Sequence, residues 1–138
     1  MEKPKILIVD DDADLRIALT TRLRAHHYQT VQASNGYSAS AVAQREQPNL
    51  ILLDLGLPAM DGFGVLEKLQ NNDTLSHIPV IVLTVRDPQL NEQKAFLAGA
   101  RAYLQKPVDN DELLAVIRAN CPVLDRYARH PSAWGELT

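Results

Sequence analysis

The sequence predicts an α/β domain in which helices cover both faces of a five-stranded, doubly wound parallel sheet. Three short apolar runs contain no alternating polar residues, which is typical of strands buried on both faces. Segments with helical spacing of apolar residues separate these runs, and strands that alternate with helices favour a parallel sheet. The 138 residues suffice for one domain with its own core but not for two ordinary ones.

Five strands are expected along the chain. The three strong ones are rich in leucine or β-branched residues, and they are Ile6–Val9, Leu50–Leu53 and Val80–Leu83. The two weaker ones are Thr30–Ala33 and Ala102–Gln105. Each strong run is followed by a polar residue, namely Asp10, Asp54 and Thr84.

Helices are expected in the segments between and after these strands. Apolar residues recur there at intervals of three and four, as in Leu15, Ala18, Leu19 and Leu23; Ala39, Val42 and Ala43; Val65, Leu66 and Leu69; and Leu113, Val116 and Ile117. Ser34 and Asp87 are predicted N-caps, and Pro88 suits the first position of a helix. Asp12 is expected to cap the first helix rather than to bind a ligand.

The number and order of these units predict the topology. Five strand–helix units in succession favour a (βα)5 fold with right-handed crossovers and the flavodoxin-like strand order 2-1-3-4-5. The domain is expected to span residues 1–120. Residues 121–138, which begin with Cys121-Pro122, are expected to form a C-terminal tail or the start of a linker.

The composition excludes several classes of function. A net charge of -3 argues against direct binding of nucleic acid and against a polybasic membrane patch. The single cysteine, Cys121, excludes an intramolecular disulfide and a zinc site made of cysteines. We expect no membrane association and a cytoplasmic location, because cysteine use fits a reducing compartment and no long apolar segment is present.

Charged residues gather where such a fold places its ligand site, beyond the carboxyl ends of the strands. Asp10, Asp11 and Asp54 are expected there together with Thr84 and Lys106. Carboxylates that lie this close resist simultaneous ionisation unless a cation joins them. A hard divalent ion with oxygen ligands resolves the conflict, so the sequence predicts a Mg²⁺ site.

The same residues suggest a reaction. Asp11 and Asp54 are the expected direct ligands of Mg²⁺, with Asp10 acting through water and the backbone carbonyl of Gly56 turning toward the ion. A carboxylate can act as a nucleophile toward phosphorus, which predicts Asp54 as a phosphoacceptor. Lys106 would neutralise the phosphoryl oxygens and Thr84 would donate a hydrogen bond to one of them.

Four segments, taken in order, resemble the receiver domains of two-component response regulators, and in particular those of the chemotaxis-regulator type. The segments are residues 6–12 (ILIVDDD), 52–62 (LLDLGLPAMDG), 82–84 (VLT) and 103–107 (YLQKP). The resemblance implies that Asp54 is phosphorylated, that Thr84 and Tyr103 form the conformational switch, and that Lys106 pairs with the phosphoryl group. It implies that Asp10 and Asp11 are the acidic pair that binds Mg²⁺. It also implies a cis peptide between Lys106 and Pro107.

The resemblance further implies a regulatory phosphoacceptor rather than an enzyme, with self-catalysed phosphotransfer and autodephosphorylation only. The donor would be a sensor histidine kinase or a histidine phosphotransfer protein, and the output would be a protein effector or an output domain outside this sequence. Val85 departs from the small residue that the family usually has after the switch threonine, so it is expected to alter reaction rates. Arg86 is expected to reach over the site.

Three other functions are compatible with parts of the pattern. A phosphotransfer intermediate in a multistep relay would carry the same residues. A phosphohydrolase of the haloacid-dehalogenase type would need a second aspartate where Gly56 stands. A flavin-binding protein would not place Asp10, Asp11 and Asp12 after its first strand, because they would repel the flavin phosphate.

Overall fold

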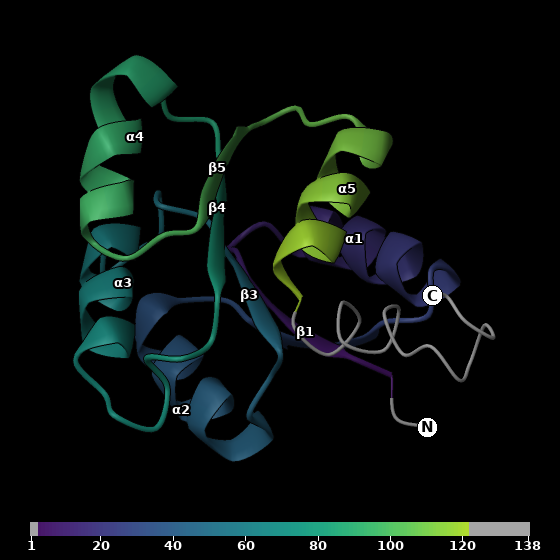
Figure 1. The fold of residues 1–138 in the computed structure, drawn as a ribbon, viewed down its shortest axis with the longest axis horizontal. Coiled ribbons are helices and arrows are strands. Elements are labelled where there is room, and N and C mark those ends of the chain that lie inside the picture. Colours follow the sequence, from purple (N-terminus) through teal and green to yellow (C-terminus); the bar gives the residue numbers. More distant parts are fainter. Residues whose placement is uncertain (1–2, 122–138) are drawn as a thin grey trace, which may run out of the picture.

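Strands and helices alternate along the whole described chain, residues 3–121, of the computed structural model (Figure 1). The strands are β1 (Lys5–Val9), β2 (Gln29–Ala33), β3 (Leu50–Leu53), β4 (Val80–Thr84) and β5 (Ala102–Gln105). The helices are α1 (Ala13–Ala25), α2 (Gly36–Glu46), α3 (Gly62–Gln70), α4 (Pro88–Leu97) and α5 (Asn110–Asn120). The predicted (βα)5 order is confirmed. Residues 122–138 of the expected tail lie outside the described residues.

The five strands form one parallel sheet in the order β2-β1-β3-β4-β5, as the sequence predicts. The register aligns the carboxyl ends of the central strands, because Val9 pairs with both Ala33 and Leu53. Backbone hydrogen bonds continue this alignment by one residue, since the N–H of Asp54 donates to the carbonyl of Val9 at 3.0 Å. The residues that follow β1 and β3 therefore meet at one edge of the sheet.

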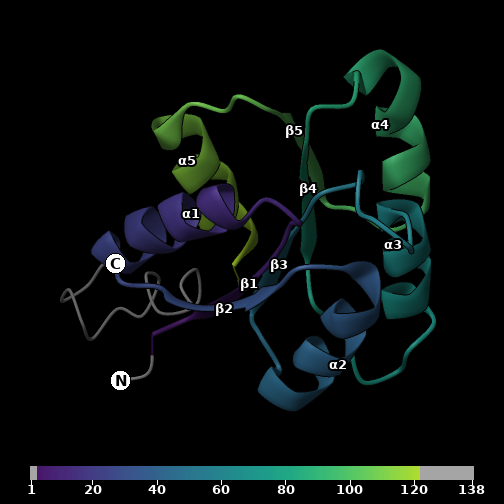
Figure 2. The same ribbon diagram turned by 180° about the vertical axis from the view of Figure 1, so that it is seen from behind.

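Each face of the sheet has its own hydrophobic core, which explains why the central strands lack polar residues. Leu7 and Val9 of β1 belong to the core beneath α2, α3 and α4, whereas Ile6 and Ile8 belong to the core beneath α1 and α5. The views in Figures 1 and 2 show this division, with α1 and α5 together on one side of the sheet. No helix within residues 3–121 is long and apolar enough to cross a membrane.

Side chains cap the helices largely as predicted. Asp12 caps α1 by accepting a hydrogen bond from the N–H of Leu15 at 3.2 Å, and Asp87 caps α4. The prediction of Ser34 as the cap of α2 is wrong, because Asn35 accepts from the N–H of Ser38 at 2.9 Å. Serine and asparagine are about equally good caps, so the choice depends on where the helix begins.

Helix α2 begins at Gly36, which packs closely against a neighbouring segment. A side chain there would lie 2.8 Å from Cβ of Met60, so glycine lets α2 approach the segment that leads into α3. Because the helix starts at Gly36, the preceding residue, Asn35, is its cap, and cap propensity alone does not distinguish it from Ser34.

Two glycines of α3 provide a matched test of how closely this helix packs on β3. A Cβ at Gly62 would lie 2.6 Å from the carbonyl oxygen of Asp54, which is backbone, whereas one at Gly64 would lie 3.3 Å from the flexible side chain of Met60. We expect Gly62→Ala to lower the free energy of unfolding by about 2 kcal/mol through overpacking. Gly64→Ala should be neutral or stabilising, because alanine favours helix. Urea denaturation of both variants checks this, and equal effects would contradict it.

Candidate functional site

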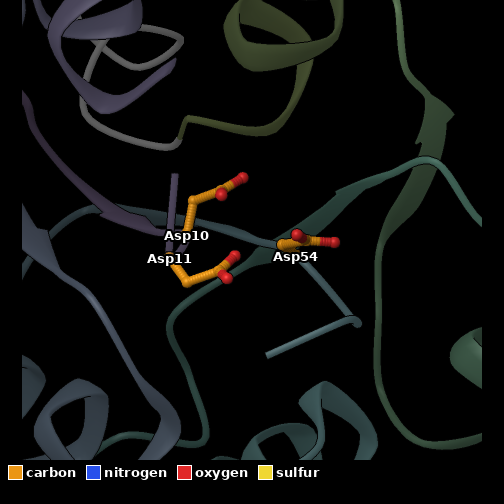
Figure 3. Close-up of side chains that lie close together, drawn as sticks. All are labelled: Asp10, Asp11 and Asp54. Carbon is orange, nitrogen blue, oxygen red and sulfur yellow. The ribbon is translucent and has the colours of Figure 1, made fainter. Parts of the chain in front are cut away.

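Three carboxylates meet at the carboxyl ends of β1 and β3 (Figure 3). One oxygen each from Asp10, Asp11 and Asp54 lies within 4.8 Å of the other two. Asp10 and Asp54 are buried, with 3% and 8% of their surfaces exposed, whereas Asp11 faces solvent. The sheet brings them together, because β1 and β3 are neighbours and these residues follow directly after them. The predicted acidic cluster is thus present.

Lys106 approaches the cluster from the loop after β5. Its Nζ donates to Oδ2 of Asp10 at 2.7 Å and to Oδ2 of Asp54 at 3.4 Å. The backbone N–H of Lys106 donates to the carbonyl of Thr84 at 2.7 Å, which fixes the loop against β4. The peptide between Lys106 and Pro107 is cis, as the sequence resemblance implies.

The charges of the cluster are only partly balanced. Burial raises the pKa of the Asp10 carboxyl, and the hydrogen bonds from Lys106 and from the N–H of Asp12 offset only part of that rise. Burial alone would lower the pKa of Lys106, but its hydrogen bond to Asp10 and the nearby Asp54 raise it overall. The Lys106 ammonium thus contacts two of the three clustered carboxylates, Asp10 and Asp54. Such a set fits a small divalent cation with oxygen ligands.

The two buried carboxylates differ in how firmly their oxygens are held. Oδ1 of Asp10 accepts from the N–H of Asp12 at 2.9 Å, in addition to the short bond between Oδ2 and Lys106. Both contacts of Asp54 are longer, at 3.4 Å to Lys106 and 3.2 Å to the N–H of Gly56. Asp10 is therefore the more tightly fixed carboxylate, and the oxygens of Asp54 remain more available. The expected role of the Gly56 carbonyl stays a prediction.

The two predicted switch residues both contact the backbone of Arg86. Thr84 is buried at the end of β4, and its Oγ1 accepts from the N–H of Arg86 at 3.4 Å. The ring of Tyr103 packs against the core beneath α2, α3 and α4, and its hydroxyl donates to the carbonyl of Arg86 at 2.9 Å. The structure thus joins Thr84 and Tyr103 through a single residue of the loop between β4 and α4.

Two polar contacts near the site were not foreseen from the sequence. The guanidinium of Arg86, which we expected to reach over the site, pairs instead with Asp61. Arg16 of α1 donates to the carbonyl of Asp10 at 2.7 Å. Exposed charges give no periodic signal, so only the three-dimensional arrangement reveals these partners. Val85 is 68% exposed, and its expected effect on rates stays a prediction.

Comparison with known proteins decides the family. Residues 6–118 match the response regulator receiver domain. The chain belongs to this family. It is a receiver domain, a regulatory phosphoacceptor of response regulators, and its acidic cluster of Asp10, Asp11 and Asp54 fits a Mg²⁺ site.

Individual relatives agree with this assignment. Protein PilH of Pseudomonas aeruginosa is 38% identical over 115 residues, which make up 83% of this chain and 95% of PilH. The DNA-binding dual master transcriptional regulator RpaA of a Synechocystis species is 39% identical over 130 residues, or 94% of this chain. The matched residues cover 53% of the length of RpaA, so this chain spans about half of that relative.

Solved structures show the same fold. A CheY-like response regulator receiver domain protein from Methanospirillum hungatei superimposes with a TM-score of 0.82 at 29% identity, covering 91% of this chain and 99% of that one.

Removal of the Lys106 charge should destabilise the domain, because it leaves the buried carboxylate of Asp10 without its counter-ion. We expect Lys106→Met to lower the free energy of unfolding by about 2–3 kcal/mol in buffer with a chelator. Lys5→Met is the control, since Lys5 pairs with Glu46 at 3.0 Å in a more exposed place and its loss should matter less. Urea denaturation measures both, and equal losses of stability would refute the prediction.

Proposed function

We propose that Asp54 is the phosphorylated residue of this receiver domain, and that the donor is a phosphohistidine of a sensor histidine kinase or histidine phosphotransfer protein. The observation that carries the proposal is the position of Asp54 within the cluster. It is buried beside Lys106, yet its two hydrogen bonds are long, so its oxygens are less engaged than those of Asp10. Asp11 is exposed and has no comparable cationic partner among the described contacts.

The proposed step is a direct phosphoryl transfer. A carboxylate oxygen of Asp54 forms a bond to phosphorus while the bond between phosphorus and the donor's imidazole nitrogen breaks. The imidazole leaves with the bonding electron pair and takes a proton from solvent. Such transfers depend mainly on positioning and charge neutralisation, and Lys106 already stands 3.4 Å from Asp54 to provide both.

Mg²⁺ is the proposed cofactor of the acidic cluster. Asp11 and Asp54 would be direct ligands, and Asp10 would act through water. The backbone carbonyl of Gly56 would be the remaining ligand from the protein. When bound, the ion supplies the positive charge that Lys106 alone does not provide. The supporting observation is that three carboxylate oxygens lie within 4.8 Å of one another, with two of these residues buried.

Thr84 and Tyr103 are the proposed switch. The hydroxyl of Thr84 would turn to donate to the phosphoryl group and give up its contact with the N–H of Arg86. Tyr103 would follow, because its hydroxyl bonds the carbonyl of the same residue. A partner protein would then bind the altered surface, on which Leu90 and Leu97 of α4 are 78% and 82% exposed.

The output is a proposal as well, because the receiver domain accounts for only part of the length of relatives such as RpaA. We infer a regulatory role without turnover of an external substrate, with autodephosphorylation ending the signal. The partner would be a protein effector or an output domain, and no direct contact with nucleic acid is proposed for this domain. A cytoplasmic location and the boundary near residue 120 stay predictions from the sequence.

Mg²⁺ should stabilise the fold through this cluster. At a concentration one hundred times its dissociation constant, we expect the free energy of unfolding to rise by about 2.7 kcal/mol. Asp11→Asn should remove most of this gain, whereas Asp14→Asn, at an exposed position of α1, should leave it unchanged. Thermal melts with Mg²⁺ and with a chelator test the prediction, which fails if both variants respond to the ion alike.

Intact mass measurement tests the phosphoacceptor directly. Incubation with acetyl phosphate and Mg²⁺ should add about 80 Da, the mass of one phosphoryl group, to the wild type. Asp54→Asn should show no gain, because an amide is a poor nucleophile. A gain of the same size in Asp54→Asn would place the modification elsewhere, and no gain in the wild type would contradict phosphorylation by small donors.

A further inference from the structure

The ion pair between Arg86 and Asp61 links two elements beside the acidic cluster. Nη2 of Arg86 lies 2.5 Å from Oδ1 of Asp61, and Nη1 lies 3.4 Å from Oδ2. Arg86 belongs to the loop between β4 and α4, whereas Asp61 is the N-cap of α3. The two residues are 25 positions apart in the sequence, so the fold alone brings them together.

The backbone of Arg86 contacts both proposed switch residues, Thr84 and Tyr103. Its N–H donates to Oγ1 of Thr84, and its carbonyl accepts from Tyr103. The hydrogen bond to Asp61 raises the pKa of the Arg86 guanidinium, and the Asp54 carboxylate adds to the rise, so the charge lies within electrostatic range of the phosphoacceptor. The side chains of Arg86 and Asp61 are 34% and 46% exposed, so the pair is open to solvent on both sides.

The backbone that follows Asp61 packs closely against the backbone at Asp54 and Leu55. The N–H of the next residue, Gly62, donates to the carbonyl of Leu55 at 2.8 Å. The same glycine packs so closely that a Cβ there would lie 2.6 Å from the carbonyl oxygen of Asp54. The carboxylate of Asp61 is held in turn by the N–H of Phe63 at 3.2 Å. The Asp61 carboxylate thus has a backbone partner besides Arg86, whereas the described hydrogen bonds of the Arg86 guanidinium go to Asp61 alone.

We propose that Asp61 and the phosphoryl group arriving at Asp54 compete for Arg86, which makes Arg86 a positioning residue for phosphoryl transfer and Asp61 the residue that limits its availability. The inference rests on the proposed function of Asp54. The guanidinium fork fits phosphate as well as carboxylate, and a phosphoryl group carries more negative charge than Asp61. Exposed ion pairs are weak, so the competition is close.

Because Arg86 lies just before α4, a change in its ion pair would occur beside the beginning of that helix. Ala95 is the one buried residue of this helix, and α4 begins two residues after Arg86. A second contact joins α4 to α3, where Nζ of Lys94 lies 4.2 Å from the centre of the Phe63 ring. This cation–π contact does not involve Arg86 or Asp61, so the loss of their ion pair would not by itself separate α3 from α4.

Kinetics with acetyl phosphate and Mg²⁺ test the proposal. In each phosphorylation event the Asp54 oxygen bonds to phosphorus, the phosphorus–oxygen bond to the acetyl group breaks, and acetate leaves. Asp61→Asn should raise the apparent second-order rate constant about two- to fivefold, because it frees Arg86 from a pair of modest strength. Asparagine still caps α3, so the helix is preserved. High salt should shrink the gain.

A double-mutant cycle shows whether Arg86 carries the effect. Arg86→Gln combined with Asp61→Asn should show the rate of Arg86→Gln alone, whereas Arg86→Lys combined with Asp61→Asn should keep part of the gain. Asp87→Asn is the matched control, since it removes an equal charge from the N-cap of α4 and should leave the rate unchanged.

Three outcomes would overturn the inference. They are a wild-type rate in Asp61→Asn, a gain that persists in the Arg86→Gln background, and an equal gain in Asp87→Asn. An unphosphorylated wild type is a different result, because it contradicts the proposed function of Asp54 itself.

Discussion

The crowding of carboxylates at the ends of β1 and β3 is the constraint on which the site depends. Two buried acids, Asp10 and Asp54, share the single ammonium of Lys106, and the exposed Asp11 adds a further negative charge. Such an arrangement is costly in an isolated domain, since burial already raises the pKa of Asp10. The hydrophobic cores on both faces of the sheet stabilise the domain enough to keep the acids together.

The sheet accounts for why sequence reasoning located these acids. Uninterrupted apolar runs identify β1, β3 and β4, and parallel strands must bring their carboxyl ends to one edge. Asp10, Asp54 and Thr84 follow from their positions in those runs. The cap of α2 could not be assigned in this way, because Ser34 and Asn35 have similar cap propensities and only the observed start of α2 at Gly36 distinguishes them.

The ion pair between Arg86 and Asp61 could not be predicted from the sequence. Both residues lie in loops or at helix starts, where no spacing rule applies, and their partners depend on how α3 and α4 sit on the sheet. The structure also joins Thr84 and Tyr103 through the backbone of Arg86. The two contacts join residues from β4, β5 and the loop between β4 and α4, so their meeting depends on the fold.

The sparse packing of α4 has an energetic consequence for any signal that the domain transmits. A helix with one buried residue loses little hydrophobic contact when it shifts, so its alternative positions differ by a small free energy. An effector that prefers one position by a modest affinity ratio can therefore redistribute the ensemble. Linkage also works in reverse, so an effector that binds the phosphorylated arrangement more tightly would itself favour phosphorylation.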